Sequence, residues 1–312
     1  MGGLAFLFPG QGSQFAGMGR DLAAAFPEAR AVYDRADAAL APFQLSISRV
    51  SFEGTEEELK LTAVTQPAIL VHSVAVFEVL KSRGLVPALL AGHSLGEWSA
   101  LVAAGALAFE DAVVLVHRRG TFMQEAVAAG QGAMSAVIGL DGPAVAAACA
   151  QVAEATGEPV SAANFNSPEQ TVVAGTAGAV AKAAEVLKQR GAKRVLPLPV
   201  SAPFHCALMK PAEEKLSPFL DATLFSNPAV PVVTNVDVAP NASGVAAREA
   251  LRRQVCSPVR WVETVELLSR ETEGAVEVGP GAVLAGLAKR IAKDWPVRTT
   301  SDAEGVRRLI AG

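Results

Sequence analysis

The hydrophobic positions of the chain alternate between short continuous apolar runs and longer stretches in which apolar residues recur every three or four positions. The first pattern is typical of buried parallel strands, and the second of amphipathic helices that pack on a sheet. Strands are predicted at residues 4–8, 86–91, 230–235 and 275–278. Helices are predicted at residues 21–40, 55–60, 66–80, 95–106, 110–128, 248–255, 261–270 and 282–291, with one more beginning near residue 207.

Local signals refine two of these helices. Thr55 and Glu58 have the spacing of a capping box, in which the side chain of each residue accepts a hydrogen bond from the backbone N–H of the other. Proline suits the first turn of a helix, where its missing N–H has no partner to lose. We therefore expect the apolar helix that contains Pro67 to begin at Gln66.

The order of elements changes between residues 130 and 198. Strands are predicted at 134–138, 160–164, 170–174 and 194–198, and helices at 143–156 and 177–190. The resulting order, β-α-β-β-α-β within about seventy residues, is the signature of a ferredoxin-like unit. We therefore predict an α/β protein in two parts. The large, hydrolase-like domain has a mostly parallel sheet and comprises residues 1–129 and 199–312, and a small ferredoxin-like domain, residues 130–198, is inserted in it.

Composition and charge narrow the class of protein. Hydrophobic residues make up 51% of the 312 positions and aromatic residues only 5%, which indicates an aliphatic core. The formal net charge of −4 argues against broad nucleic-acid binding. We see no run of the ~18 apolar residues that a membrane span needs. Cys149, Cys206 and Cys256 suggest neither a disulfide framework nor a metal site, so we expect a cytoplasmic protein.

The stretch with the clearest chemistry is Gly92-His93-Ser94-Leu95-Gly96, at the junction of a predicted strand and a predicted helix. This G-x-S-x-G pattern is typical of a nucleophile elbow, in which the glycines make room for a sharp turn and the serine is held at the head of the helix. A second Gly-rich loop, residues 9–14, follows the first strand but lacks the spacing of a dinucleotide-binding or phosphate-binding loop. It lies where open α/β sheets place their active sites.

A serine nucleophile needs a base, and the chain has four histidines. His72 lies in an apolar helix and His117 precedes two arginines, so both are expected to be structural. His93 adjoins Ser94 and is expected to shape the site. His205 lies in a loop far from Ser94 in the sequence, which is how such catalytic pairs are usually assembled, and we take it as the base.

Two features of the sequence indicate the type of reaction: the position of Arg119, and the lack of an acidic residue that could complete a catalytic triad. Arg119 lies among apolar neighbours on a predicted helix, and an arginine buried near a nucleophile suits bidentate capture of a carboxylate. An arginine that reaches the surface is the alternative. No aspartate or glutamate suggests itself as the third member of a triad, so an amide or a backbone carbonyl is left to orient the histidine, which weakens a plain hydrolase interpretation.

Together, these residues resemble the malonyl-CoA:acyl carrier protein transacylase family. The motifs that carry the resemblance run in order over nearly the whole chain: Phe8-Pro9-Gly10-Gln11-Gly12-Ser13-Gln14, Gly92-His93-Ser94-Leu95-Gly96-Glu97, Arg119-Gly120 with Phe122-Met123-Gln124, Asn164-Phe165-Asn166-Ser167-Pro168, Pro203-Phe204-His205, and Gln254 with Pro258-Val259-Arg260-Trp261.

The resemblance implies a role for each site residue. Ser94 is the nucleophile and His205 its base, with the ring oriented by the backbone carbonyl around Gln254. The remaining roles are the oxyanion hole, from the backbone amides of Gln11 and Leu95, and the substrate pocket, from Arg119, Gln66, His93, Asn164, Asn166, Phe204 and Gln254. Arg119 would pair with the malonyl carboxylate, and Phe204 would favour malonyl over methylmalonyl.

The resemblance also implies the reaction and the partners. The enzyme would transfer malonyl from malonyl-CoA to the pantetheine thiol of acyl carrier protein, through a malonyl-serine ester, for fatty-acid synthesis. It would need no cofactor, bind neither nucleic acid nor membrane, and act as a monomer. A basic cluster of the small domain is a candidate docking surface for the acidic carrier protein, with a solvated helix face as the alternative: Lys182, Lys188, Arg190, Lys193 and Arg194. A polyketide acyltransferase, a serine thioesterase and an inactive binding module are the alternative functions.

Overall fold

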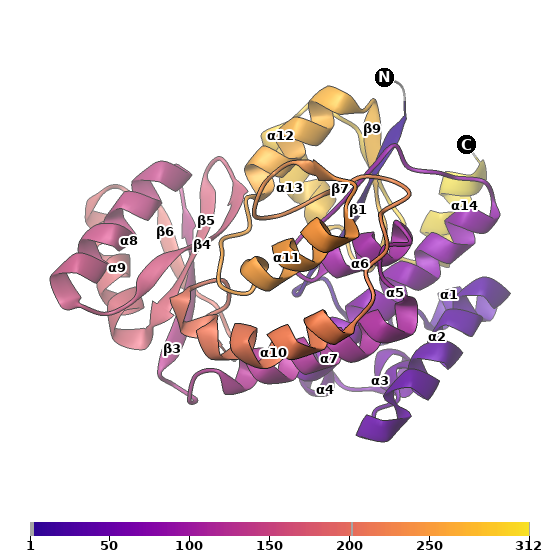
Figure 1. Ribbon diagram of the computed structural model, residues 1–312. Helices are drawn as coiled ribbons and strands as arrows, with labels where there is room; N and C mark the ends of the chain where they lie inside the picture. The colour runs from indigo at the N-terminus through magenta and orange to yellow at the C-terminus, as the bar shows by residue number, and fades with distance from the viewer. Residues whose placement is uncertain (1–2, 201, 312) are drawn as a thin grey trace.

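A six-stranded sheet forms the centre of the larger part of the molecule (Figure 1). The structure, a computed structural model, describes residues 3–200 and 202–311. The strands lie in the order β10-β9-β1-β2-β7-β8, and all neighbours are parallel except β7 and β8. Their bounds are β1 Leu4–Phe8, β2 Leu89–Gly92, β7 Val232–Val233, β8 Pro240–Asn241, β9 Gly274–Glu277 and β10 Val297–Thr299.

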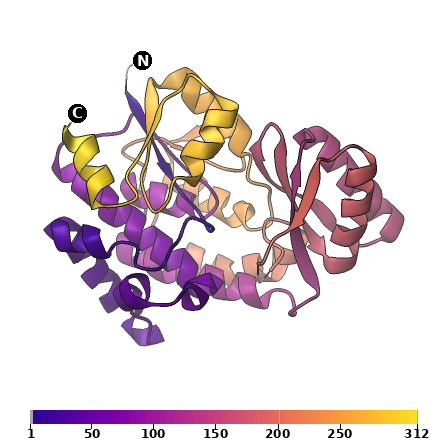
Figure 2. The same cartoon turned by 180° about the vertical axis from the view of Figure 1, so that it is seen from behind.

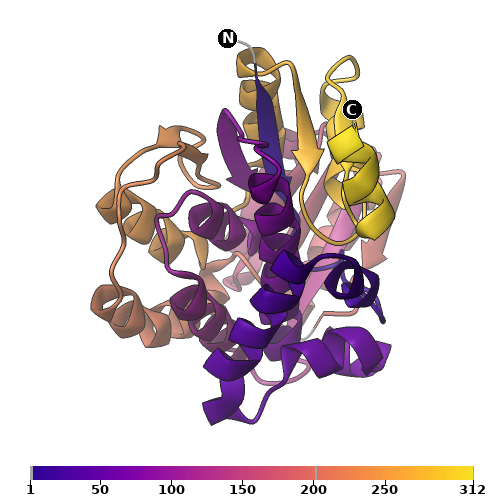
Figure 3. The same ribbon diagram turned by 90° about the vertical axis from the view of Figure 1, so that its right-hand side faces the viewer.

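Helices cover both faces of this sheet, as its apolar strands require. Alternate residues of β1 face two separate cores: Phe6 and Phe8 pack with α5, whereas Ala5 and Leu7 pack with α12 and α13. In Figures 2 and 3 the C-terminal helix α14 lies beside the N-terminal helices, where the backbone amide of Ala303 donates to Asp21 Oδ2 at 2.8 Å. The helices are α1 Arg20–Ala25, α2 Pro27–Leu40, α3 Ile47–Glu53, α4 Glu56–Lys60, α5 Thr62–Ser82, α6 Gly96–Ala103, α7 Phe109–Glu125, α10 Lys210–Ala222, α11 Gly244–Gln254, α12 Trp261–Glu271, α13 Val283–Ile291 and α14 Ala303–Ala311, with short 3₁₀ turns at Ala41–Phe43 and Ala207–Met209.

A second, antiparallel sheet lies to one side of the first (Figure 1). Its strands follow the order β4-β5-β3-β6, and α8 and α9 pack with it around a core of their own. The elements are β3 Gly132–Ile138, α8 Gly142–Thr156, β4 Val160–Ser167, β5 Gln170–Thr176, α9 Ala177–Gln189 and β6 Arg194–Pro197. The predicted α/β class is thus confirmed, with a mostly parallel sheet and a second sheet built from the β-α-β-β-α-β order.

The second sheet is joined to the larger part by backbone hydrogen bonds. Val259 N donates to the Ala163 carbonyl and Phe165 N donates to the Val259 carbonyl, each at 2.9 Å. A segment that follows α11 therefore pairs with the edge of β4. This pairing fixes the residues at the end of β4 relative to the carboxyl edge of the parallel sheet.

Helix α5 begins at Thr62, one turn earlier than Gln66, and Pro67 lies inside it. Proline cannot donate to the carbonyl four residues before it, which is that of Ala63. His117 of α7 fills this gap, because its Nδ1 lies 2.9 Å from the Ala63 carbonyl and donates to it. The helix can therefore tolerate its proline, and His117 has the structural role expected of it.

Helix α5 also corrects the expectation that no segment could span a membrane. It has 21 residues, and an 18-residue window within it has a mean hydropathy of 1.6, which meets the requirement by length and composition. Yet 83% of its apolar window is buried inside the protein, between the sheet and α2 and α7. It is the core helix of the larger part.

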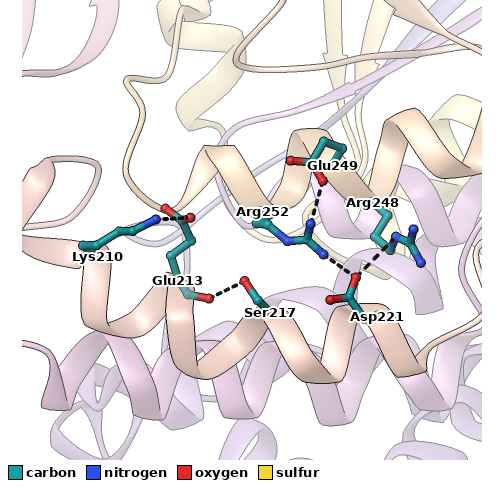
Figure 4. Close-up of polar contacts among 7 residues, drawn as sticks. All are labelled: Lys210, Glu213, Ser217, Asp221, Arg248, Glu249 and Arg252. Atoms are coloured by element: carbon teal, nitrogen blue, oxygen red, sulfur yellow. Dashed lines mark hydrogen bonds and ion pairs between the residues drawn. The ribbon is translucent and has the colours of Figure 1, made fainter.

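Charged side chains join α10 to α11 (Figure 4). Arg252 bonds to Asp221 of α10 and, at 2.7 Å, to Glu249 of its own helix, while Arg248 lies 4.0 Å from Asp221. Exposed pairs contribute at most about 1 kcal/mol each. Their effect here is local, since they hold the last turn of α11, which ends at Gln254, against α10.

Several elements differ from the prediction. The strand expected at residues 230–235 is reduced to Val232–Val233, and β8, β10, α3 and α14 were not predicted. Strands β8 and β10 lie at opposite edges of the sheet. Each pairs over few residues, and its apolar run is too brief to predict a strand. Helix α14 has its hydrophobic residues on one narrow face, which docks against α5 and α1.

The junction of β1, β2 and α6 predicts a steric effect of Gly96. A Cβ at this position would lie 1.9 Å from the Phe8 carbonyl oxygen, so Gly96→Ala should lower the free energy of unfolding by about 1–3 kcal/mol or more, measured by urea titration. Gly286→Ala is the control, because Gly286 lies on the exposed face of α13 and a Cβ there would meet nothing within 4 Å, so it should stabilise by about 0.5–1 kcal/mol. Equal stability of Gly96→Ala and the parent protein would contradict the tight junction.

Candidate active site

Ser94 occupies a sharp turn between β2 and α6. Its backbone has φ 51°, in the left-handed region that residues other than glycine rarely adopt. The flanking glycines are required by close approaches: a Cβ on Gly92 would lie 1.9 Å from the carbonyl carbon of Gly96, and Gly96 packs against Phe8. The turn therefore presents the Ser94 side chain at the carboxyl edge of the parallel sheet, as expected for a nucleophile elbow.

His205 lies beside Ser94 and is the second residue with a left-handed backbone in this region, at φ 59°. The Ser94 hydroxyl and His205 Nε2 are 2.7 Å apart, and His205 Nδ1 is 2.9 Å from the Gln254 carbonyl. Because a carbonyl only accepts, Nδ1 carries the ring proton and Nε2 is free to accept from the serine. The structure brings the predicted pair together, and a backbone carbonyl orients the ring.

The surroundings of His205 keep its ring neutral. Burial and the positive charge of Arg119 lower the pKa of His205 from its ordinary value of 6.5 to about 3. The neutral ring retains its accepting Nε2 at any pH near neutrality. A proton acceptor is thus maintained next to the Ser94 hydroxyl.

Arg119 of α7 is buried, with 2% of its surface exposed. Its Nη1 donates to Gln66 Oε1 at 2.8 Å, and its Nη2 donates to Gln254 Oε1 at 3.1 Å and to the Ser94 hydroxyl oxygen at 3.2 Å. Burial lowers the pKa of Arg119 to about 10, so the side chain remains a cation at neutral pH. All three acceptors are neutral, which leaves a buried positive charge beside the serine without a carboxylate in hydrogen-bond contact.

A cavity of about 170 Å³ opens over Ser94. Its lining contains ten of the eleven predicted site residues: Gln11, Gln66, His93, Ser94, Leu95, Arg119, Asn164, Asn166, Phe204 and His205. Gln254 is the exception, because its side chain is fully buried behind Arg119. Apolar side chains, among them Met134 and Leu198, form the rest of the wall.

The backbone amides of Gln11 and Leu95 are placed to form an oxyanion hole. Gln11 follows β1 and Leu95 follows Ser94, so both lie at the carboxyl edge of the sheet and line the cavity. Within the described part of the chain neither N–H donates a hydrogen bond. Both donors are therefore free to bind an oxygen placed in the cavity.

His93 and Asn166 connect the elbow to the second sheet. His93 Nε2 donates to Asn166 Oδ1 at 2.8 Å, and the His93 ring packs edge-on against Trp261 at 5.5 Å. Burial lowers the pKa of His93, which keeps this ring neutral as well. Asn164, two residues before Asn166 in β4, is 7% exposed and lines the cavity.

Sequence reasoning missed two polar residues behind the elbow, Glu97 and Asn235. Asn235 Oδ1 accepts from the Ser94 backbone amide at 2.8 Å, and its Nδ2 donates to the Gly92 carbonyl at 2.7 Å. Glu97 accepts from the Asn235 backbone amide at 2.9 Å. The sequence does contain signals for both residues. Glu97 ends the motif that begins at Gly92, and Asn235 is a polar residue at the carboxyl end of a predicted strand, where active-site residues are common.

A larger cavity, of about 790 Å³, lies on the other side of His205 between α8, β4 and Lys210. His205 is common to the linings of the two cavities. In the described residues, no group of three or more His, Cys, Asp or Glu side chains is placed to hold a metal ion. The lining of the smaller cavity includes Ser94, His205 and Arg119.

Comparisons with known proteins agree with this arrangement. The acyl transferase domain profile matches residues 5–309. Malonyl CoA-acyl carrier protein transacylase of Escherichia coli (strain K12) is 52% identical over 289 residues, covering 92% of each chain. The protein of the same name from Bacillus subtilis (strain 168) is 47% identical, covering 99% of this chain and 97% of its own.

Solved structures give the same result. An acyl carrier protein S-malonyltransferase from Vibrio cholerae has a TM-score of 0.94 and 47% identity, covering 98% of this chain and 99% of its own. A malonyl-transacylase in complex with a type II PKS acyl-carrier protein has a TM-score of 0.95 and 47% identity, covering 99% of each chain. The chain therefore belongs to the acyl transferase domain family, as an acyltransferase of the malonyl CoA-acyl carrier protein transacylase group.

Proposed function

We propose that this acyltransferase moves the malonyl group of malonyl-CoA to the pantetheine thiol of acyl carrier protein, through an ester on Ser94. The observation that carries the proposal is the buried guanidinium of Arg119, 3.2 Å from the Ser94 hydroxyl oxygen and bonded only to neutral acceptors. A buried cation gains most from a carboxylate that it can bind in two places. Malonyl carries such a carboxylate at the end opposite its thioester.

In the first half-reaction Ser94 Oγ attacks the thioester carbon while His205 Nε2 takes the hydroxyl proton. The carbonyl oxygen gains negative charge, which the backbone amides of Gln11 and Leu95 stabilise. When the C–S bond breaks, His205 returns the proton to the CoA sulfur, and malonyl remains as an ester on Ser94. A positioned base of this kind contributes typically ~10²–10⁴-fold, and each oxyanion donor roughly 10²–10³-fold in kcat.

The second half-reaction reverses these steps with a different thiol. His205 takes the proton of the pantetheine thiol, the sulfur attacks the ester carbon, and the proton passes to Ser94 Oγ as the C–O bond breaks. A thioester is consumed and a thioester is formed, so the transfer should run in both directions. These two half-reactions require no cofactor.

Arg119 also makes the base respond to the substrate. Its charge is one of the causes that lower the pKa of His205. A carboxylate bound to Arg119 neutralises that charge and raises the basicity of His205. The enzyme is thus better prepared to activate Ser94 when an acyl group with a carboxylate is present.

The other cavity residues complete the pocket. Gln66 holds Arg119 in place, while His93, Asn164 and Asn166 contribute polar groups to the wall. Phe204, 9% exposed, limits the room beside the acyl chain. We assign it a preference for malonyl over methylmalonyl, worth the ~1–3 kcal/mol that one methyl group can provide.

The partner and pathway follow from the same assignment. A structure 47% identical to this chain is bound to an acyl-carrier protein, which supports a carrier protein as the acceptor. Fatty-acid synthesis is the proposed pathway and polyketide synthesis the alternative. We assign the enzyme to the cytoplasm as a monomer, with residues 130–198 as a small domain between the two segments of a large one, residues 1–129 and 199–312.

The docking surface proposed for the carrier protein is the basic face of α9 and β6. Two of its cations are already paired, Lys182 with Glu185 at 2.9 Å and Lys193 with Glu169 at 3.6 Å. These pairs reduce the positive charge that the face offers. An acidic partner would have to compete with them.

The covalent intermediate is tested by mass spectrometry. Mixing the enzyme with malonyl-CoA should add one malonyl group, located on Ser94, and Ser94→Ala should abolish the addition. Ser99→Ala is the matched control, since Ser99 is buried on α6, the helix that follows the elbow, and lies outside the cavity lining. An absent adduct contradicts the mechanism, and release of free malonate as fast as transfer would instead indicate a thioesterase.

The carboxylate contact is tested by Arg119→Ala. Removing one partner of a buried charge pair should lower kcat/KM for malonyl-CoA by about 30- to 1,000-fold. Acetyl transfer has no carboxylate to lose and should be unchanged or faster. Arg118→Ala, whose side chain stacks on Phe43 and Phe219 instead, is the control. An unchanged malonyl preference in Arg119→Ala would rule out the contact.

The pH dependence tests the state of His205. Protonation of His205 removes the acceptor, and its pKa is lowered in the free enzyme, so Ser94 acylation should persist as the pH falls well below 6.5. The measurement is kcat/KM for acylation against pH. In Arg119→Ala the acid limb should move to higher pH, because one cause of the low pKa is gone. A parent enzyme that loses activity at pH 6.5 or above would contradict this assignment.

A further inference from the structure

Glu97 is a carboxylate buried directly behind the nucleophile. It lies three residues after Ser94, on the first turn of α6, and none of its surface is exposed. Its Oε2 accepts from Gln254 Nε2 at 2.7 Å and from the Asn235 backbone amide at 2.9 Å. Its Oε1 is buried and has no hydrogen-bond partner among the described residues. The acylation steps above make no use of this group.

Glu97 is the closest of the three acceptors that set which way the Gln254 amide faces; the third, Asn235 Oδ1, lies 3.3 Å from Nε2. Gln254 Nε2 donates to Glu97 and, at 3.0 Å, to the Ser94 carbonyl. Both partners only accept, so the nitrogen must lie on this side. The amide oxygen consequently faces Arg119 Nη2, at 3.1 Å.

The opposite orientation of Gln254 would be unfavourable at both ends. Its oxygen would meet the Glu97 carboxylate and its NH₂ would meet the Arg119 guanidinium, so that two hydrogen bonds would become two repulsive contacts. Without Glu97 the amide loses the closest of its three acceptors on this side, and the Ser94 carbonyl at 3.0 Å and Asn235 Oδ1 at 3.3 Å hold its orientation less firmly. Arg119 would then lose one of the acceptors that aim its Nη2 at Ser94.

We propose that Glu97 is a positioning residue: it fixes the Gln254 amide and, through it, aims the Arg119 guanidinium at the acyl carboxylate. The proposal rests on the function proposed above, in which Arg119 binds that carboxylate. It makes malonyl selectivity depend on a residue that does not line the substrate cavity.

The charges around Glu97 are compatible with a geometric role. Arg119 of α7, Arg253 of α11 and Asp237 beyond Asn235 act on it, and burial raises the pKa of Glu97 to about 7. Proton uptake at the unpartnered Oε1 leaves Oε2 accepting from Gln254 and Asn235. A neutral side chain with an oxygen in the Oε2 position should therefore preserve the function.

The test compares kcat/KM for malonyl-CoA and acetyl-CoA in variants of the full-length enzyme. Glu97→Ala should lower the malonyl-to-acetyl ratio by about 10- to 100-fold, the effect of a lost hydrogen bond to a charged group. Glu97→Gln should keep the ratio within about 3-fold of the parent, since it retains an acceptor for Gln254. If Glu97→Ala does not fold, Glu97→Met, of similar volume and without the acceptor, provides the same comparison.

Glu277→Ala is the matched control for general damage. Glu277 is also fully buried and also accepts two hydrogen bonds, from the backbone amides of Leu284 and Ala285, but it lies at the end of β9 and outside the cavity lining. Its removal should lower stability and leave the ratio unchanged. A shift in the ratio as large as that of Glu97→Ala would show that any buried glutamate has this effect, and would overturn the proposal.

A double variant links the effect to Arg119. In an Arg119→Ala background, Glu97→Ala should cause no further change in the ratio, because the group that it positions is gone. An unchanged ratio in Glu97→Ala alone, or an equal loss in Glu97→Gln, overturns the positioning role. A parent enzyme that forms no malonyl ester on Ser94 would contradict the proposed function instead, so the two failures are distinguishable.

Discussion

A buried cation without a carboxylate in contact is the constraint on which the rest of this active site depends. Burying a charge is costly unless polar groups surround it. Arg119 is held by neutral oxygens from three distant elements: Gln66 on α5, Ser94 at the elbow and Gln254 at the end of α11. Each of these oxygens satisfies a donor without cancelling the charge. The positive charge is therefore preserved for a ligand.

The fold assembles the groups around Ser94 by bringing loop ends to one edge of the parallel sheet. Gln11, Ser94 and Asn235 all follow parallel strands, so they meet at the carboxyl edge although they are far apart in the sequence. The strained backbone of Ser94 is held by Asn235, which bonds to the Ser94 amide and to the Gly92 carbonyl. The second sheet completes the enclosure through Asn166 and His93. Strain at Ser94 is thus offset by the hydrogen bonds of Asn235, which follows a neighbouring strand.

The sequence was informative where local chemistry determines the structure, and less so where distant contacts do. The G-x-S-x-G turn, the β-α-β-β-α-β order and the Thr55–Glu58 capping box could all be predicted, because each depends on residues close together in the chain. The start of α5 could not, since the helix continues through Pro67 only because His117 bonds to Ala63 from another helix. The part played by Glu97 was also missed. A glutamate on an apolar helix shows no partner in the sequence, and its partners here come from residues 235 and 254.

The partner of His205 explains why this site lacks the acid of a hydrolase triad. A carboxylate bonded to His205 Nδ1 would orient the ring and raise its pKa, but it would lie close to Arg119, whose charge already acts on His205. Such an acid would compete with the substrate for the guanidinium. The Gln254 carbonyl orients the same ring, at 2.9 Å, without adding a negative charge. Gln254 therefore contacts both halves of the site. Its backbone carbonyl accepts from His205, and its side chain, which donates to Glu97, accepts from Arg119. Glu97 acts on Arg119 only from a distance, so under the proposed function the acyl group supplies the carboxylate that binds the guanidinium directly.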